Sequence, residues 1–284
     1  MNSVPIADRP HLLRLSRLPS GEPEIFASIQ GEGVTCGLPS VFVRLALCNL
    51  ECSFCDTAYT WDWTHYDRKA EIIGLEAADV VQRVMCLLQA SPAGEPLPPT
   101  PSPARRGGVK PAIFSGGSTG RSRALHIRNV VITGGEPLLQ QRALVDLAAA
   151  LKAEDARIEV ETNGTIRPQQ RLGALVDQWN VSPKLASSGN RATAREVADA
   201  LAWFAACPTA YFKFVVVEPA DLDEVAALAA RYDVPTDRML LMPEGTDPET
   251  LAARSTWLVE RCQMLGYRFS TRLHILLWGD QRGR

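Results

Sequence analysis

Residues 41–55 read Val-Phe-Val-Arg-Leu-Ala-Leu-Cys-Asn-Leu-Glu-Cys-Ser-Phe-Cys, an apolar run followed directly by a loop with three cysteines. The run at 41–47 is typical of a buried strand. The loop spaces Cys48, Cys52 and Cys55 as Cys-x3-Cys-x2-Cys. Iron–sulfur clusters are usually held by four thiolates, so three would leave one iron of a four-iron cluster without a protein ligand. The stretch therefore predicts a 4Fe-4S cluster with one iron open to a small molecule.

A zinc site and disulfide bonds are the two alternatives for the cysteines. Structural zinc usually takes four nitrogen or sulfur ligands in spaced pairs, and the nearest residue that could complete a local set, His65, lies at an unusual spacing. Disulfides fit less well, because the chain has seven cysteines and carries no secretory signal. We favour the cluster over both.

Length and charge indicate one catalytic domain that acts on a small molecule. The chain has 284 residues and a formal net charge of −2, so it has no basic field for nucleic acid. Residues 1–19 lack the apolar run of a signal peptide, and no stretch is long enough to cross a membrane. We therefore expect a cytoplasmic protein with reduced thiols and with neither a nucleic-acid nor a membrane partner.

Apolar runs recur along the chain and alternate with helical patterns such as 138–153 and 222–232. Near-continuous apolar strands joined by helices indicate a parallel sheet covered on both faces. Six such units are two short of an eightfold barrel, so the sequence predicts an α/β fold, a partial, open parallel β/α barrel of about six strands. An edge strand is expected at 25–29, and the segment 267–277 is expected to close the far side. The six predicted strands are 41–47, 129–133, 158–161, 179–182, 211–217 and 239–242.

Glycine, proline and asparagine gather where these strands end. The cysteine loop follows the first strand, and the segments 134–137, 163–165, 183–184 and 243–245 follow later ones. Turns favour these residues in any barrel, so each segment alone is weak evidence for an active site. Because the loops at this end of a parallel barrel build its active site, the segments together predict one pocket.

The expected domain organisation is simple. Residues 1–20 are an N-terminal extension, and 21–284 form a single catalytic domain. A stretch rich in proline and glycine at about 90–128 has few apolar anchors, so we expect a mobile insertion. The alternative is a docking arm that uses its basic residues Arg105, Arg106, Lys110, Arg121 and Arg123.

Several motifs resemble those of a known family. Residues 24–33 read Glu-Ile-Phe-Ala-Ser-Ile-Gln-Gly-Glu-Gly, and Asp-Thr follows the last cysteine of the loop. Thr-Gly-Gly-Glu-Pro at 133–137, Glu-Thr-Asn-Gly-Thr at 161–165, Ser-Pro-Lys at 182–184 and Lys-Phe-Val-Val at 213–216 match in order. The chain thereby resembles the 7-carboxy-7-deazaguanine synthase family of radical S-adenosylmethionine (SAM) enzymes. The resemblance covers most of the chain outside the insertion and the first twenty residues.

The resemblance implies a reaction of 7-deazapurine and queuosine biosynthesis. In it, 6-carboxy-5,6,7,8-tetrahydropterin becomes 7-carboxy-7-deazaguanine through ring contraction and loss of ammonia. The implied cofactors are a 4Fe-4S cluster, SAM and Mg²⁺, and the chemistry would begin with a 5′-deoxyadenosyl radical that abstracts the C6 hydrogen of the substrate. A reducing electron donor such as flavodoxin or ferredoxin and a homodimeric state are also implied.

The same matching assigns roles to residues. The cluster would be held by Cys48, Cys52 and Cys55, and Thr57 would reach magnesium; Asp56 and Thr57 could instead cap a turn. The implied SAM contacts are Phe54, Asp56, Gly134, Gly135, Glu136, Asn163, Ser182, Pro183 and Lys184. The implied substrate contacts are Ile29, Gln30, Gly31, Arg44 and Thr133. The implied catalytic residues are Glu32, Arg44, Glu161 and His274.

Some of these assignments have structural alternatives. Arg44 could form a core ion pair instead of meeting the substrate carboxylate. Lys213, in the Lys-Phe-Val-Val motif, could equally form an ion pair inside the barrel instead of taking part in the site. Met242 stands where some relatives carry glutamine, so only backbone contacts to SAM are expected there. The chain continues past His274, so the site role of a terminal carboxylate is open, and Trp278 or Asp280 could replace it.

Two further functions are compatible with the sequence. Another radical SAM enzyme, such as a glycyl-radical activase, would share the cysteine loop. An iron–sulfur or zinc binding module with a vestigial pocket would show no SAM cleavage. Cys36, Cys86, Cys207 and Cys262 are expected to be small core residues without a catalytic role.

Overall fold

The structure is a computed structural model that describes residues 12–89 and 127–284. Its strands are β1 (Leu12–Ser16), β2 (Ile25–Ile29), β3 (Pro39–Leu45), β4 (Ile72–Glu76), β5 (Asn129–Gly134), β6 (Arg157–Thr162), β7 (Gln178–Val181), β8 (Ala210–Val216), β9 (Met239–Pro243) and β10 (Arg268–Phe269). Its α-helices are α1 (Arg68–Glu71), α2 (Ala77–Gln89), α3 (Gln141–Ala153), α4 (Gln170–Gly173), α5 (Ala192–Arg195), α6 (Ala198–Ala206), α7 (Asp221–Tyr232), α8 (Pro248–Leu265) and α9 (Leu273–Trp278).

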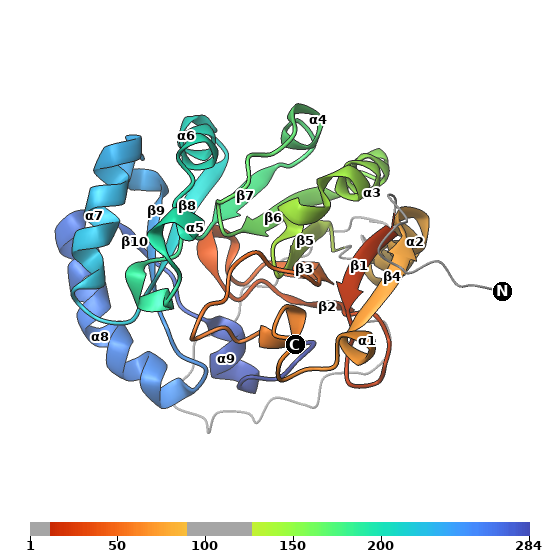
Figure 1. Cartoon of the computed structure of the whole chain (residues 1–284), viewed down its shortest axis with the longest axis horizontal. Coiled ribbons are helices and arrows are strands. Elements are labelled where there is room, and N and C mark those ends of the chain that lie inside the picture. Colours follow the sequence, from red (N-terminus) through yellow and green to blue (C-terminus); the bar gives the residue numbers. More distant parts are fainter. Residues whose placement is uncertain (1–11, 90–126) are drawn as a thin grey trace, which may run out of the picture.

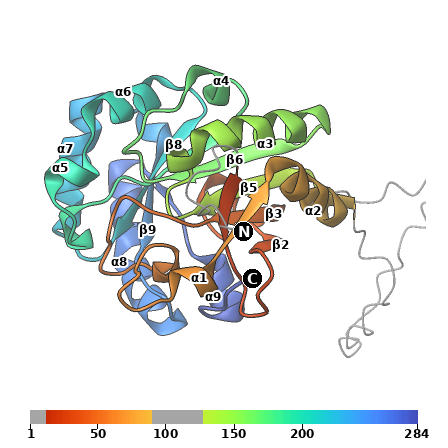
Figure 2. The ribbon, with the colours of Figure 1, turned by 45° about the vertical axis from the view of Figure 1, so that its right-hand side comes forward.

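One curved sheet runs through the described residues in the order β10-β9-β8-β7-β6-β5-β3-β1-β4, and β2 pairs with β3 beside this path. The strands from β3 through β10 along this order are parallel, whereas β1, β2 and β4 are antiparallel additions. The longer helices lie around the outside of the sheet (Figure 1). Helices α2 and α3 lie side by side, as both ribbon views show (Figures 1 and 2). The predicted open, parallel β/α barrel is confirmed.

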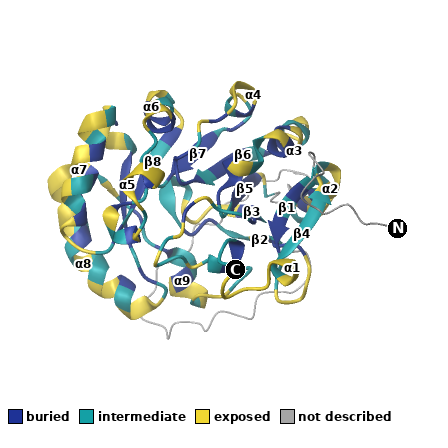
Figure 3. Ribbon diagram, viewed as in Figure 1, coloured by how far each residue is buried: buried dark blue, intermediate teal, exposed yellow. Residues whose placement is uncertain are grey.

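Alternation along the strands separates two faces of the sheet. On β3, Val41, Val43 and Leu45 join the main apolar core beneath the helices. The intervening Phe42 instead packs with Phe26 and Val131 in a separate small cluster inside the barrel. Because successive side chains of a strand point to opposite faces, the next inward residue of β3 is Arg44. The interior of the barrel is therefore polar near the carboxyl ends of its strands, while the strands themselves are buried (Figure 3).

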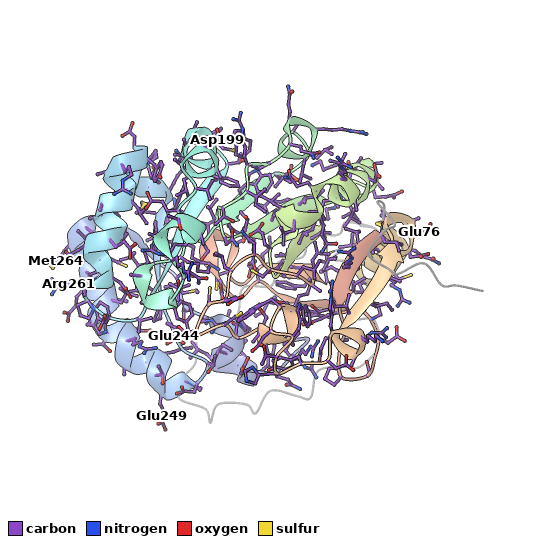
Figure 4. All side chains as sticks on the ribbon, viewed as in Figure 1. Glu76, Asp199, Glu244, Glu249, Arg261 and Met264 are labelled. Atoms are coloured by element: carbon purple, nitrogen blue, oxygen red, sulfur yellow. The ribbon has the colours of Figure 1, made fainter. Side chains whose placement is uncertain are left out.

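Helix α8 illustrates how local sequence sets the outer layer. Its first turn is capped by Asp247, whose carboxylate accepts a hydrogen bond from the Thr250 amide at 2.8 Å. It ends at Leu265, and the C-cap residue Gly266 has a φ of 70°, a left-handed conformation that glycine adopts easily. Side chains of α8 such as Glu249 and Met264 lie at the periphery of the molecule (Figure 4).

Two strands, β1 and β4, were not predicted from the sequence. Strand β1 lies within residues 1–20, which were expected to form an extension, yet Leu13 and Leu15 are fully buried. It pairs with β4 from Leu12 to Ser16, so this part of the expected extension belongs to the sheet. The expected edge strand at 25–29 is confirmed as β2, and the segment 267–277 contributes β10 and most of α9.

The expected insertion at 90–128 lies, apart from its last two residues, outside the described residues. In the described part of the chain, no helix combines the length and the apolar character needed to span a bilayer.

Candidate active site

One cavity of about 500 Å³ opens at the carboxyl ends of the parallel strands. It is lined from β2 and the turn after it, from the cysteine loop, from the ends of β5 to β9, and from the C-terminal segment. The predicted site residues that line it are Ile29, Gln30, Gly31, Glu32, Arg44, Cys48, Cys52, Phe54, Cys55, Asp56, Thr57, Thr133, Gly134, Gly135, Glu161, Asn163, Ser182, Lys184 and His274. The prediction of a single pocket on this rim therefore matches the geometry.

The Gly134-Gly135 turn packs directly against the start of the cysteine loop. A Cβ on Gly134 would lie 1.9 Å from the Leu45 carbonyl oxygen, and one on Gly135 would lie 2.0 Å from the Leu47 carbonyl oxygen. The Gly135 amide donates to the Leu45 carbonyl at 3.0 Å, and the Glu136 amide donates to that of Leu47 at 2.8 Å. Only glycine permits this approach. The packing of the cysteine loop against the end of β5 therefore requires these two glycines, independently of any contact with a ligand.

The three cysteine thiols face the cavity with donors beside them. The Trp61 indole N–H donates to Cys55 Sγ at 3.3 Å, and the Asn190 amide donates to Cys52 Sγ at 3.2 Å. Burial raises the pKa of the Cys48 thiol to about 12, so in the metal-free chain it is protonated. Metal binding at this thiol would release a proton.

The donor set fits a cluster better than a single ion. Among the described residues, no three side chains of His, Cys, Asp or Glu converge as they would around one metal. A single zinc needs such convergence, with four ligands at one point. Thiolates of a four-iron cluster bind separate irons, so their sulfurs need not meet.

Glu32, on the turn after β2, is surrounded by cations. It pairs with Lys213 of β8, and its carboxylate accepts from Arg272 Nε at 3.0 Å. His274 Nε2 lies 3.9 Å from Glu32 Oε1. Burial alone would raise the pKa of Glu32, but the charges of Lys213 and Arg272 hold this pKa well below its usual value. Glu32 is therefore an anion on the cavity wall, and the ion-pair alternative for Lys213 is what the structure contains.

Glu161, on β6, connects the cavity floor to β2 and β5. It accepts from Gln30 Nε2 at 3.1 Å and from the Thr133 hydroxyl at 2.6 Å. The Gln30 side-chain oxygen in turn accepts from the Glu32 amide at 3.2 Å. The Gln30 and Thr133 side chains are thus oriented by protein partners.

Arg44 forms the core ion pair considered as its alternative role, yet it still reaches the cavity. Its Nε donates to Glu24 Oε1 at 2.8 Å. Its two Nη groups make no hydrogen bond to any described residue, and its side chain is 19% exposed. One edge of the guanidinium therefore stays available to a ligand.

His274 and Gly31 determine each other's position. A Cβ at Gly31 would lie 2.1 Å from His274 Nδ1, so no larger residue fits there. The Gly31 carbonyl accepts from the Leu273 amide at 2.8 Å, which ties α9 to the turn after β2. Burial lowers the pKa of His274 although Glu32 opposes the shift, which favours the neutral imidazole.

A polar wall continues from β6 to β7. The Asn163 side-chain amide donates to Asn49 in the cysteine loop at 2.9 Å. Lys184 Nζ donates to the carbonyl and hydroxyl oxygens of Ser182 at 3.0 and 2.9 Å. This places one cation, Lys184, on the cavity wall.

Two predicted residues do not line the cavity. Glu136 is fully buried, and its carboxylate accepts from the amides of Leu138 and Asn163 and from the Thr162 hydroxyl, at 2.7 to 3.0 Å. With these three donors it anchors the loop after β5 to the end of β6, and the expected contact with the SAM ammonium stays a prediction. Pro183 faces an apolar pocket beneath the sheet instead. A residue in a strand-end loop can point either way, and the motif does not say which.

Several cavity residues were not predicted from the sequence. Arg272 pairs with Glu32 and Asp56 and donates to the Gly245 carbonyl at 2.7 Å. Arg282, in the C-terminal segment, pairs with Glu24 at 3.3 Å. Arg272 could have been found from the sequence, because it lies two residues before the predicted site residue His274. No local pattern singles out Arg282, or Asn190, which lies outside the cavity lining and donates to Cys52, because their partners are more than 100 residues away in the sequence.

Of the two tail residues considered as substitutes for a terminal carboxylate, Asp280 lines the cavity. Burial and the neighbouring Asp56 raise its pKa. Trp278 lies partly exposed outside the cavity lining. Met242 lines the cavity, as expected at the end of β9.

Comparison with known proteins identifies the family. No family model matches the chain. It is 36% identical to a 7-carboxy-7-deazaguanine synthase of Pyrobaculum aerophilum over 92% of this chain and 96% of that protein. It is 33% identical to one of Halobacterium salinarum over 90% of each. The structure of QueE from Escherichia coli superposes with a TM-score of 0.59 at 20% identity, covering 96% of this chain and all of that one, and so shares the fold. The chain therefore belongs to the 7-carboxy-7-deazaguanine synthase family.

Proposed function

We propose that this chain is a radical SAM lyase that converts 6-carboxy-5,6,7,8-tetrahydropterin to 7-carboxy-7-deazaguanine, with ring contraction and loss of ammonia. One observation carries the proposal. In a chain 36% identical to a synthase of that name, the three cysteines and the polar residues assigned to substrate line the same cavity. The product would enter 7-deazapurine or queuosine biosynthesis.

The cysteine loop would hold the 4Fe-4S cluster, and the open iron would bind SAM. When bound, the two supply one-electron reduction and hydrogen-atom abstraction. Phe54 and Asp56 would contact the adenosine. Lys184, held by Ser182 at the cavity wall, places a positive charge where a SAM carboxylate could pair with it.

The opposite wall would hold the substrate. The free Nη edge of Arg44 suits the pterin carboxylate, because a guanidinium binds carboxylates through parallel hydrogen bonds. Ionised Glu32 is an acceptor for the N–H groups of the pterin, and the Gly31 region would form the floor beneath them. Neutral His274, beside Glu32, could accept a proton during the rearrangement.

Magnesium would bind near Thr57, whose hydroxyl lines the cavity 3.6 Å from Cys55 Sγ. Mg²⁺ keeps most of its waters and takes few protein ligands, so one hydroxyl together with the substrate carboxylate is a reasonable site. Asp56 is engaged by Arg272 and would remain outside this site.

The remaining proposals follow from the family. A reducing partner such as flavodoxin or ferredoxin would deliver the electron, and the enzyme would work as a homodimer in the cytoplasm.

The test is anaerobic reconstitution of the cluster followed by incubation with dithionite, SAM, Mg²⁺ and 6-carboxytetrahydropterin. Mass spectrometry should detect 5′-deoxyadenosine and 7-carboxy-7-deazaguanine together. Deoxyadenosine without the deazaguanine would refute the substrate and retain the radical SAM class. Neither product from a loaded cluster would refute the proposal.

A further inference from the structure

Glu24 lies between two arginines that come from opposite ends of the chain. Its side chain is fully buried. Oε1 accepts from Arg44 Nε at 2.8 Å, and Oε2 accepts from Arg282 Nε at 3.3 Å. The Tyr59 hydroxyl lies 3.2 Å from both oxygens. Each guanidinium therefore has one oxygen of the same carboxylate.

Arg282 is held in this position by two further contacts. Its Nη2 donates to Glu71 at 2.8 Å, and its guanidinium carbon lies 3.5 Å from the centre of the Tyr59 ring. Its side chain is 19% exposed. The C-terminal segment is thereby fixed beside α1 and the cysteine loop, at the edge of the cavity.

Arg282 limits how Arg44 can bind Glu24. An arginine and a carboxylate prefer a bidentate pair, in which two N–H groups of the guanidinium meet both oxygens. Here Arg282 donates to Oε2 and the Tyr59 hydroxyl lies equally close to both oxygens, so Arg44 donates only its Nε, to Oε1. The Nη edge of Arg44 is left facing the cavity. Without Arg282, Arg44 could turn to bind both oxygens and withdraw that edge.

We propose that Arg282 is a positioning residue for the substrate carboxylate, acting through Glu24 to keep the Nη edge of Arg44 free in the cavity. This inference rests on the proposed function, because it concerns the carboxylate of that substrate. Arg282 also shares the charge of Glu24 between two cations, so Arg44 retains more positive charge toward the cavity than a one-to-one pair would leave.

The test compares Arg282→Gln, Glu24→Gln and the double variant as cluster-loaded enzymes with SAM. Arg282→Gln should raise KM for 6-carboxytetrahydropterin about tenfold, the loss of one charge-assisted hydrogen bond, with little change in kcat. Glu24→Gln with Arg282→Gln should restore most of the affinity. A neutral amide offers Arg44 a single acceptor oxygen, so the bidentate pair cannot form.

A second measurement separates positioning from general damage to the tail. Tetrahydropterin without the 6-carboxylate should inhibit wild type and Arg282→Gln with the same Ki, because it makes no contact with Arg44. Arg83→Gln, which removes an exposed ion pair with Glu22, is the control and should leave KM unchanged.

Three results would overturn the inference: an unchanged KM in folded Arg282→Gln, an equal rise in KM and in the tetrahydropterin Ki, or no recovery in the double variant. A wild-type enzyme that forms no deazaguanine would instead refute the proposed function, which keeps the two failures distinct.

Discussion

At the scale of single residues, Gly31 is fixed by the imidazole that covers it. In Gly31→Ala the new methyl group would start 2.1 Å from His274 Nδ1, so the ring or the turn after β2 must move. Overpacking of this kind costs about 1–3 kcal/mol. A shift of about 1 Å in a positioning group can cost roughly 100-fold in rate, so kcat/KM should fall by about that factor.

Steady-state kinetics and thermal unfolding of the loaded enzyme check this. Gly173→Ala is the matched control, because its methyl group would meet only the edge of the Trp203 ring, at 3.1 Å, outside the cavity lining. If Gly31→Ala and Gly173→Ala had similar activity, the proposed place of His274 over the turn would be wrong.

Trp61 tests the cluster itself at the residue scale. Its indole N–H donates to Cys55 Sγ, and hydrogen bonds to cluster sulfurs stabilise the reduced, more negative state. Trp61→Phe should therefore lower the midpoint potential by tens of millivolts, where about 59 mV corresponds to a tenfold change in a one-electron equilibrium. Redox titration followed by electron paramagnetic resonance measures it. Trp63→Phe, which alters a ring beneath Arg68, should leave the potential in place, and equal shifts in both variants would contradict the assignment.

At the scale of elements, Glu136 joins the loop after β5 to the end of β6. Its carboxylate accepts from two backbone amides and from Thr162, all buried. Glu136→Ala would leave these donors unpaired, and each orphaned donor costs about 1–3 kcal/mol. Glu136→Gln keeps two acceptor lone pairs and should lose less. Denaturant unfolding of the two variants shows which one loses more free energy of unfolding. A variant that lost SAM affinity at unchanged stability would instead restore the ligand role.

Elements were predictable where one pattern decides them. The parallel strands have near-continuous apolar runs, which exist because both faces are covered, and every predicted strand is present. Strands β1 and β4 were missed because each depends on pairing with the other, about 60 residues away. The cavity residues were predictable from strand ends and motifs. Their partners were not, because Arg272 and Arg282 meet Glu32 and Glu24 only after the two ends of the chain come together.

At the scale of the whole molecule, one ion network connects these distant segments. Glu32 follows β2, Lys213 lies on β8, and Arg272 precedes α9 while also holding Asp56 in the cysteine loop. Glu32 is shared by the two cations, so either one can still hold it if the other is removed. Losing both would leave a buried carboxylate with only the neutral His274 beside it.

This sharing predicts a coupling between Lys213→Met and Arg272→Met. Each single variant should cost about 1–3 kcal/mol of unfolding free energy, and the double variant should cost more than their sum by at least about 0.5 kcal/mol.

The sign of the pH dependence of stability should change as well. In wild type the lowered pKa of Glu32 gives stability that is present above its unfolded value near 4.5 and lost as pH falls through the folded pKa. In the double variant burial alone acts and raises the pKa, so lowering the pH from 7 to 5 should stabilise that protein relative to wild type. Denaturant unfolding at both pH values measures these quantities. Lys152→Met with Arg167→Met, whose cations pair with separate carboxylates, is the additive control. Additivity at the Glu32 site would mean that the cations act independently and that the network does not join the two ends of the chain.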